Sequence, residues 1–159
     1  MSASIQSLDE GLVLDRFQVE DPDFDGAPSE ERMESVSQAM VSSLDQSQGE
    51  QPVFRRTWKD SKNVSTPDLE HLPTRVVIDN STLPDCTIID IFAHDRTGLL
   101  YTIARTIYQL NLSVKYAKIG TYLDQVVDVF YVNDLEGSKI TDDQRLETIR
   151  AELLSAIER

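Results

Sequence analysis

One pattern of strand and helix residues occurs twice in this chain, and this repetition constrains the fold more than any other feature. Residues 14–21 align with residues 127–134 so that Asp15 meets Asp128 and Phe17 meets Phe130. The same offset carries the apolar stripe of the helix after each strand: Arg32, Met33, Val36, Met40, Val41 and Leu44 fall on Arg145, Leu146, Ile149, Leu153, Leu154 and Ile157. A strand and a helix that recur with one spacing predict two copies of one structural unit.

The first copy lacks its front half. Ala3 and Ile5 match Ala117 and Ile119, so the chain opens in the strand that precedes the matched one. We therefore expect the repeat unit to extend upstream of Met1. The segment between the copies is rich in Ser, Gln, Asn, Asp and Pro, which is typical of a linker. The predicted organisation is a truncated repeat at 1–45, a linker at 46–73 and a complete domain at 74–159.

The charge balance excludes several classes of partner. The 28 Asp and Glu outnumber the 15 Lys and Arg, and the net charge is −13. A surface of this sign repels phosphate backbones and anionic lipid, so we expect no nucleic-acid and no membrane partner. The single cysteine, Cys86, excludes an internal disulfide and fits a reducing compartment. No apolar run approaches the ~20 residues that cross a bilayer, and residues 1–14 lack the basic start of a signal peptide. The predicted location is cytoplasmic.

The order of elements in the second copy predicts an α+β fold. The pattern gives strands at 75–79 and 87–93, a helix at 98–110, a hairpin of 114–121 with 125–133, and a last helix capped by Thr141. Strand, helix, strand, strand, helix is the order of a ferredoxin-like, split βαβ sandwich. The first copy shows only its end: strands at 4–8 and 12–19 joined by a turn at 9–11, then a helix capped by Ser29.

Two features of the sheet follow from this pattern. The fold normally closes with a strand antiparallel to its first strand, and residues 75–79 are predicted to take that edge. The strand 126–132 is apolar on both faces, whereas the first copy has Arg16 and Gln18 on one of them. Phe130 and Val132 should therefore face the helices. Val127, Val129 and Tyr131 are left on an outer face that predicts contact with another domain.

The chemistry of the second copy is concentrated where the strand 87–93 passes into a helix. Gly98 allows close backbone approach, and the helix start offers unpaired N–H groups, which together suit the carboxylate of an amino acid. Asp95 would take its ammonium group. The simpler alternative is that Asp95 only caps the helix and Gly98 only serves a tight turn. Asp128 is a second candidate, because a carboxylate among apolar residues must find donors from a ligand amine, the helix start or a structural partner.

Three motifs carry a resemblance to a known family. These are residues 95–101, residues 117–121, and residues 127–134 with 137–140. Together they resemble the ACT domain at the C-terminus of the bacterial [protein-PII] uridylyltransferase/uridylyl-removing enzyme, and residues 2–44 are similar to the tail of the ACT domain before it. One departure is Thr97, where the family commonly has proline. Another is the hairpin turn at 123–124, where a glycine is usual.

The resemblance implies a regulatory role. Tandem ACT domains of that family sense glutamine, and the full-length enzyme modifies the PII protein. The implied partners are thus an amino acid, glutamine first, another ACT domain or a second copy through the sheet, and PII through the full-length enzyme. The ligand residues that the resemblance and the pattern imply are Asp95, Arg96, Thr97, Gly98, Leu99, Leu100, Lys118 and Asp128.

The catalytic parts of that family do not appear in the sequence. A nucleotidyltransferase needs a Gly-Ser helix start followed by paired Asp residues, and only His71, His94 and Asp95 are reminiscent of the metal-dependent removing domain. Residues 21–26 begin like a calcium-binding loop, but Arg32 stands where that loop needs a glutamate. We expect no cofactor, no metal and no catalytic residue. The remaining alternatives are a scaffold without a ligand, an RNA-reading module, and the ACT domain of a stringent-response nucleotide synthetase.

Overall fold

The described part of the computed structural model comprises residues 2–7, 13–19, 21, 24, 26–45, 73–122 and 125–159. The chain divides into two compact units, one of Met1–Val19 with Ser65–Arg159 and one of Glu20–Val64. The larger unit holds the complete repeat and the two strands of the truncated one. The linker predicted at 46–73 lies almost wholly outside the described residues.

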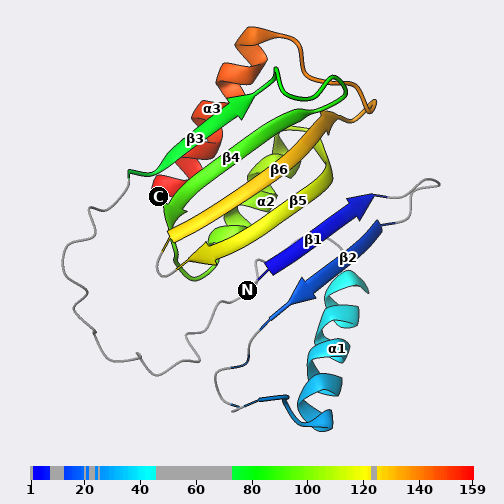
Figure 1. The fold of residues 1–159 in the computed structure, drawn as a ribbon. Coiled ribbons are helices and arrows are strands. Elements are labelled where there is room, and N and C mark those ends of the chain that lie inside the picture. Colours follow the sequence, from blue (N-terminus) through cyan, green and yellow to red (C-terminus); the bar gives the residue numbers. More distant parts are fainter. Residues whose placement is uncertain are drawn as a thin grey trace. The chain divides into compact units, whose positions relative to one another are not determined.

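The complete repeat folds as predicted. Its elements are β4 (Thr87–His94), α2 (Leu99–Gln109), β5 (Leu112–Tyr122), β6 (Gln125–Asp134) and α3 (Asp143–Glu158). β6 lies between β4 and β5 and is antiparallel to both. Figure 1 shows α2 and α3 on one side of this sheet. The order and the pairing are those of a ferredoxin-like, split βαβ fold, which confirms the predicted fold class.

The closing strand comes from the segment before the repeat. β3 (Arg75–Asp79) pairs antiparallel with β4, with Val77 opposite Asp90, and it is the outermost strand on that side. The prediction that this hairpin supplies the missing edge is therefore confirmed. A loop network holds it in place, because Asn80 Nδ2 donates to the Ile140 carbonyl at 2.7 Å and the Thr87 hydroxyl donates to Asn80 Oδ1 at 2.8 Å.

The ends of the helices show why the chain turns where it does. α2 ends before Asn111, whose φ of 55° is the left-handed conformation that commonly terminates helices. α3 is capped by Asp142, whose Oδ1 accepts the Arg145 N–H at 2.7 Å. The predicted cap, Thr141, was wrong by one residue, since α3 begins at Asp143 and Asp142 therefore takes the cap position.

The two faces of the sheet differ as expected from the first copy. Phe130 and Val132 are buried beneath the helices, while Val127 is 40% exposed on the other face. Each large apolar side chain that is fully buried contributes about 1.5–3 kcal/mol, so the helix-facing side supplies most of the stability. The core consists of Val76, Ile89, Ile91, Ala93, Leu99, Ile103, Ile107, Leu112, Ala117, Ile119, Val126, Phe130, Val132, Ile140, Ile149, Leu153 and Ile157.

The strands of the truncated repeat extend the same sheet. β1 (Ser2–Ser7) pairs antiparallel with β2 (Val13–Gln18) and, on its other edge, with β5. Ser4 pairs with Lys118, and these two residues also occupy equivalent positions when the two copies of the repeat are aligned. The two repeats are thus joined through equivalent strands, about an approximate two-fold axis between these two residues. The predicted turn at 9–11 lies outside the described residues.

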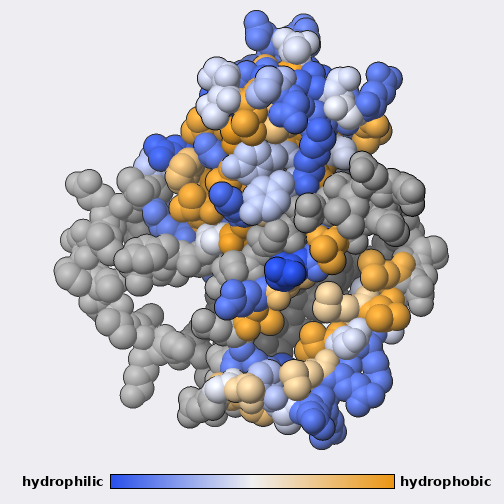
Figure 2. Space-filling model, turned by 45° about the vertical axis from the view of Figure 1, so that its right-hand side comes forward, coloured by the Kyte–Doolittle hydropathy of each residue, from blue (hydrophilic) through white to orange (hydrophobic). Residues whose placement is uncertain are grey.

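The helix of the truncated repeat belongs to the smaller unit. α1 (Glu30–Asp45) begins after Ser29, whose hydroxyl accepts the Arg32 N–H at 3.3 Å, as predicted. Its apolar stripe is exposed, by 45–86%: Met33, Val36, Met40, Val41 and Leu44. On the face drawn in Figure 2, apolar side chains reach the surface in several separate groups among hydrophilic ones.

Candidate ligand-binding site

The loop between β4 and α2 presents a helix start without a side-chain cap. Gly98 is the N-cap of α2, with φ 80° and ψ 6°, and no side-chain hydrogen bond caps the helix there. The backbone closes the loop, since the Leu99 N–H donates to the Arg96 carbonyl at 3.1 Å. The alternative that Asp95 caps the helix is therefore wrong, and Thr97 does not cap it either. An uncapped helix start keeps its positive end available to an anion.

Asp128 is the only charged side chain that is buried among the described residues, and it lies on the helix-facing side of β6. Its Oδ1 accepts the Gly120 N–H at 3.1 Å, and its Oδ2 has no hydrogen-bond partner. The β5–β6 pairing runs to Lys118 opposite Val129 and resumes at Thr121 opposite Val126, so this bond fills an interval in the ladder. A buried acceptor without a donor is costly, which marks the position as a candidate site.

The electrostatics of Asp128 indicate which kind of group would suit its unbonded Oδ2 atom. Burial raises the pKa of Asp128 to about 6, the Gly120 amide lowers the pKa, and the negative charge of Asp95 raises it further. Asp95, in the loop before α2, is thus close enough to Asp128 for their negative charges to repel each other. Two carboxyl groups of like charge favour a cation between them, and a primary ammonium group supplies both the charge and the missing donor.

The other predicted ligand residues take different positions. Leu99 is buried and Leu100 is partly buried, and both pack in the core under the loop. Arg96 points along the molecule to the end of α3, where its Nη2 donates to the carbonyls of Ala156 at 3.4 Å and Ile157 at 3.3 Å. Arg96 thus fastens the loop to the last turn of α3.

Lys118 lies on the face of the sheet away from Asp128. It is exposed and sits directly opposite Val129 in the ladder, and directly opposite residues share a face. Its Nζ lies 5.9 Å from the centre of the Tyr116 ring. Asp95 lies near enough to Asp128 to raise its pKa, whereas Lys118 lies on the opposite face of the sheet.

Sequence reasoning missed two partners in this region. Gly120, the donor to Asp128, stood in one of the quoted motifs, and an isolated glycine within a strand is the signal that could have found it. The bond from Arg96 to α3 has no signal in the sequence, because it joins segments 60 and 61 residues apart.

Metal ligands and membrane spans were also sought among the described residues. They contain no group of three or more His, Cys, Asp and Glu side chains that could hold a metal ion. Asp21, the first residue of the suspected calcium loop, accepts a bond from Arg32 Nε at 2.8 Å. His71 lies outside the described residues. No described helix has the length and apolar character needed to cross a bilayer.

The fold and this uncapped loop define a small α+β domain of the regulatory type. Residues 75–159 match the family model described as "ACR9-like, ACT-like domain". The chain belongs to the ACT-like domain family.

Two similar curated proteins share the same name. The chain is 35% identical over 158 residues to the bifunctional uridylyltransferase/uridylyl-removing enzyme of Azospirillum brasilense, which covers 99% of this chain and 17% of that protein. It is 36% identical over 166 residues to the enzyme of the same name from Gluconobacter oxydans (strain 621H), covering 99% of this chain and 16% of that one. The chain therefore spans about a sixth of the length of these relatives. No solved structure matches it.

Proposed function

We propose that this chain is the amino-acid-sensing module of a PII uridylyltransferase/uridylyl-removing enzyme, with glutamine as its ligand. The ligand's α-carboxylate binds at the start of α2 beside Gly98, and its ammonium group donates to Asp128 Oδ2 and to Asp95. The observation that carries this proposal is the buried Asp128 oxygen that has no donor. The described residues supply a regulatory domain, and catalysis is assigned to parts of the enzyme beyond them.

The zwitterion of an α-amino acid fits this arrangement better than an anion or a cation alone. The helix start favours a negative group, whereas Asp95 and Asp128 favour a positive one. A simple anion would face two carboxylates, and a simple cation would leave the helix start empty. The choice of glutamine rests on the resemblance of residues 95–101 and 127–134 to the sensor of that enzyme family.

The outer face of the sheet supports the proposed domain partner. Val77 and Val127 are 42% and 40% exposed, and the rings of Tyr116 and Tyr131 lie 5.5 Å apart on the same face. Exposed apolar side chains on a sheet mark a contact surface. We assign it to another ACT domain, in a longer protein or in a second copy, and PII is contacted through the full-length enzyme.

Amide NMR tests the site directly. Titration of the ¹⁵N-labelled chain with L-glutamine should shift the amide signals of Gly98 and Gly120, since the first lies at the carboxylate site and the second bonds to Asp128. Asp128→Asn should abolish these shifts, because the neutral side-chain amide presents an NH₂ group in place of one carboxylate oxygen and offers the ammonium group no charged acceptor. Glu136→Gln is the matched control, an exposed side chain remote from the loop.

The outcomes separate the hypotheses. Shifts with L-glutamine and none with D-glutamine support the sensor. Absence of shifts at Gly98 and Gly120 with every amino acid would favour a scaffold that binds no ligand. Shifts with another amino acid but not with glutamine would remove the assignment to the uridylyltransferase sensor and reopen the stringent-response alternative.

A further inference from the structure

Among the residues that the structure describes, the outer edge of β3 is a strand edge without a pairing strand. β3 and β2 are the two outermost strands of the sheet. β2 corresponds to β6 in the second copy of the repeat. β6 pairs with β4 on one edge and with β5 on the other, so the edge that is open in β2 is occupied by a strand in the second copy. In the described part of the chain, the outer edge of β3 has no such equivalent. Unpaired edges are templates for another strand unless charge or cover protects them.

The sequence of β3 is complementary to itself when it is read antiparallel. It reads Arg75, Val76, Val77, Ile78 and Asp79. Two such strands side by side, centred on Val77, place each Arg75 opposite Asp79 of the other copy and each Val76 opposite Ile78. The pairing thus matches opposite charges at its two ends and apolar side chains between them. Hydrogen bonds from the hydroxyl of Thr82 and from Ser81 hold the pKa of Asp79 well below its usual range, so it is an anion at neutral pH.

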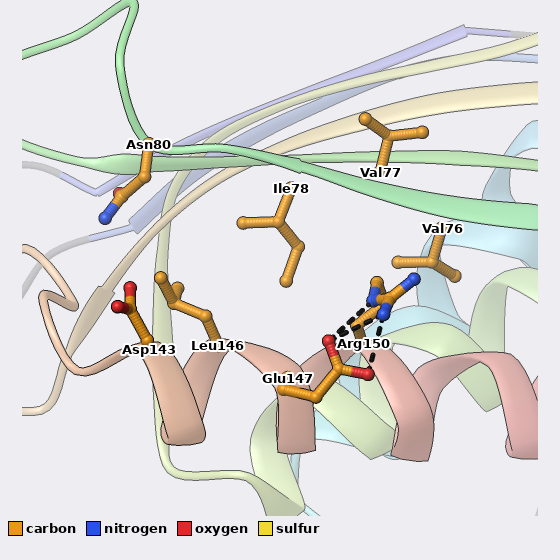
Figure 3. Close-up of a pocket in the computed structure, with 8 residues that line it drawn as sticks. All are labelled: Val76, Val77, Ile78, Asn80, Asp143, Leu146, Glu147 and Arg150. Carbon is orange, nitrogen blue, oxygen red and sulfur yellow. Dashed lines mark hydrogen bonds and ion pairs between the residues drawn. The ribbon is translucent and has the colours of Figure 1, made fainter.

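A groove beside the edge has the same self-complementary character. It lies between β3 and α3 (Figure 3). Its volume is about 400 Å³. Val76, Ile78 and Leu146 form its apolar part, and the exposed ion pair of Arg150 with Glu147, at 2.6 Å, forms its rim. In Figure 3 Arg150 lies under the Val76 end of β3 and Glu147 lies nearer Ile78. A two-fold axis at Val77 would therefore bring Arg150 of one copy to Glu147 of the other.

We propose that two copies of this chain associate through β3, antiparallel and about a two-fold axis at Val77. The two sheets then become one continuous sheet, and the two grooves meet beneath the paired Val76 and Ile78 positions on the helix-facing side. A two-fold contact of this kind is closed, so it stops at a dimer and does not grow into a fibre. Opposite charges at the contact also offset the repulsion between two chains that each carry −13.

The contact is small, and the dimer is accordingly weak. One five-residue strand and one groove from each copy bury less than a standard interface. A dissociation constant on the order of 10–100 μM is expected. Sedimentation velocity with the full chain between about 5 μM and about 1 mM should therefore show a reversible monomer–dimer equilibrium.

Charge exchange on α3 tests the geometry. Glu147→Lys places two cations opposite two cations across the axis, and Arg150→Glu places anions opposite anions. Each single variant should weaken the dimer roughly tenfold or more. The double variant Glu147→Lys with Arg150→Glu restores the match and should dimerise like the wild type. The exposed control Glu152→Lys, outside the groove, should leave the constant unchanged.

Mixing the two single variants gives the sharpest result. Their heterodimer pairs Lys with Glu and Arg with Glu, so the mixture should dimerise although neither variant does so alone at the same concentration. A wild type that stays monomeric at about 1 mM overturns the proposal. So does a dimer that is indifferent to Glu147→Lys and is lost with Val127→Glu, which would move the contact to the outer face of the sheet.

Discussion

Replacing Asp128 by asparagine should stabilise the fold at neutral pH while it destroys the ligand site. The carboxyl is completely buried, and its pKa in the folded protein is about 6 against an ordinary value of 3.8. A pKa raised by about two units means that the folded state holds the proton more tightly than the unfolded chain does. Protonated Asp128 therefore stabilises the fold fully below pH ~4, and this stabilisation is lost as the pH rises through 6.

The magnitude follows from the size of that shift. Each pKa unit corresponds to about 1.4 kcal/mol, so ionised Asp128 costs the fold about 3 kcal/mol at pH 8 and about 1.5 kcal/mol at pH 5. Asparagine retains an oxygen for the Gly120 N–H and carries no charge, but its buried NH₂ group loses about 1–2 kcal/mol for want of an acceptor. The net gain at pH 8 is about 1–2 kcal/mol, and it vanishes near pH 5.

Urea unfolding followed by circular dichroism at pH 5, 6, 7 and 8 measures this difference. The free energy of unfolding of Asp128→Asn minus that of the wild type should rise by about 1.5 kcal/mol over this range. The exposed control Glu136→Gln should show a flat difference. A flat difference for Asp128→Asn as well would refute the argument, because it would mean that Asp128 has the same pKa in the folded and unfolded chains.

Three other substitutions probe the loop and the core. Gly98→Ala should cost about 1–2 kcal/mol in urea unfolding, because φ is 80° there, and should also weaken ligand binding; Gly137→Ala, with the same φ, should cost a similar amount and leave ligand binding unchanged. Asn133→Ala should cost about 2–3 kcal/mol in the same assay, because it strands the carbonyls of Asp85 and Gly137 that Asn133 Nδ2 bonds at 2.7 and 3.0 Å. Leu153→Ala should lower the melting temperature through a loss of about 2–5 kcal/mol, whereas Ser155→Ala on the exposed side of α3 should change it little.

The helices and strands of the second copy could be predicted because the spacing of apolar residues and the order of the elements indicate the same fold. The strand 126–132 is apolar on both faces, and the polar Arg16 and Gln18 of the first copy indicated which of its faces lies against the helices. The closing role of β3 followed from its place before β4 and from the fold's need for a fourth strand. Local pattern and global fold agreed, which is the condition under which such reasoning succeeds.

The site could be predicted only in part. The sequence singled out Asp95, Gly98 and Asp128 because glycine, carboxylate and strand end have chemical meaning in sequence, and their role in ligand binding stays a prediction. Lys118 was carried over from the resemblance, and the alternation of β5 turned it to the other face. The hydrogen bond from the Gly120 N–H to Asp128 interrupts the backbone pairing of β5 with β6. It depends on how the two strands are aligned, and the sequence shows no sign of it beyond the glycine itself.

Calorimetry at pH 6 in two buffers of different ionisation enthalpy tests the central claim most directly. If the ammonium group of glutamine binds Asp128, it must expel the proton that about half of the molecules carry there, since the pKa is about 6. The account predicts binding with release of roughly half a proton per ligand, and no release for Asp128→Asn. Binding of glutamine to the wild type with the same heat in both buffers, or no binding at all, would contradict it.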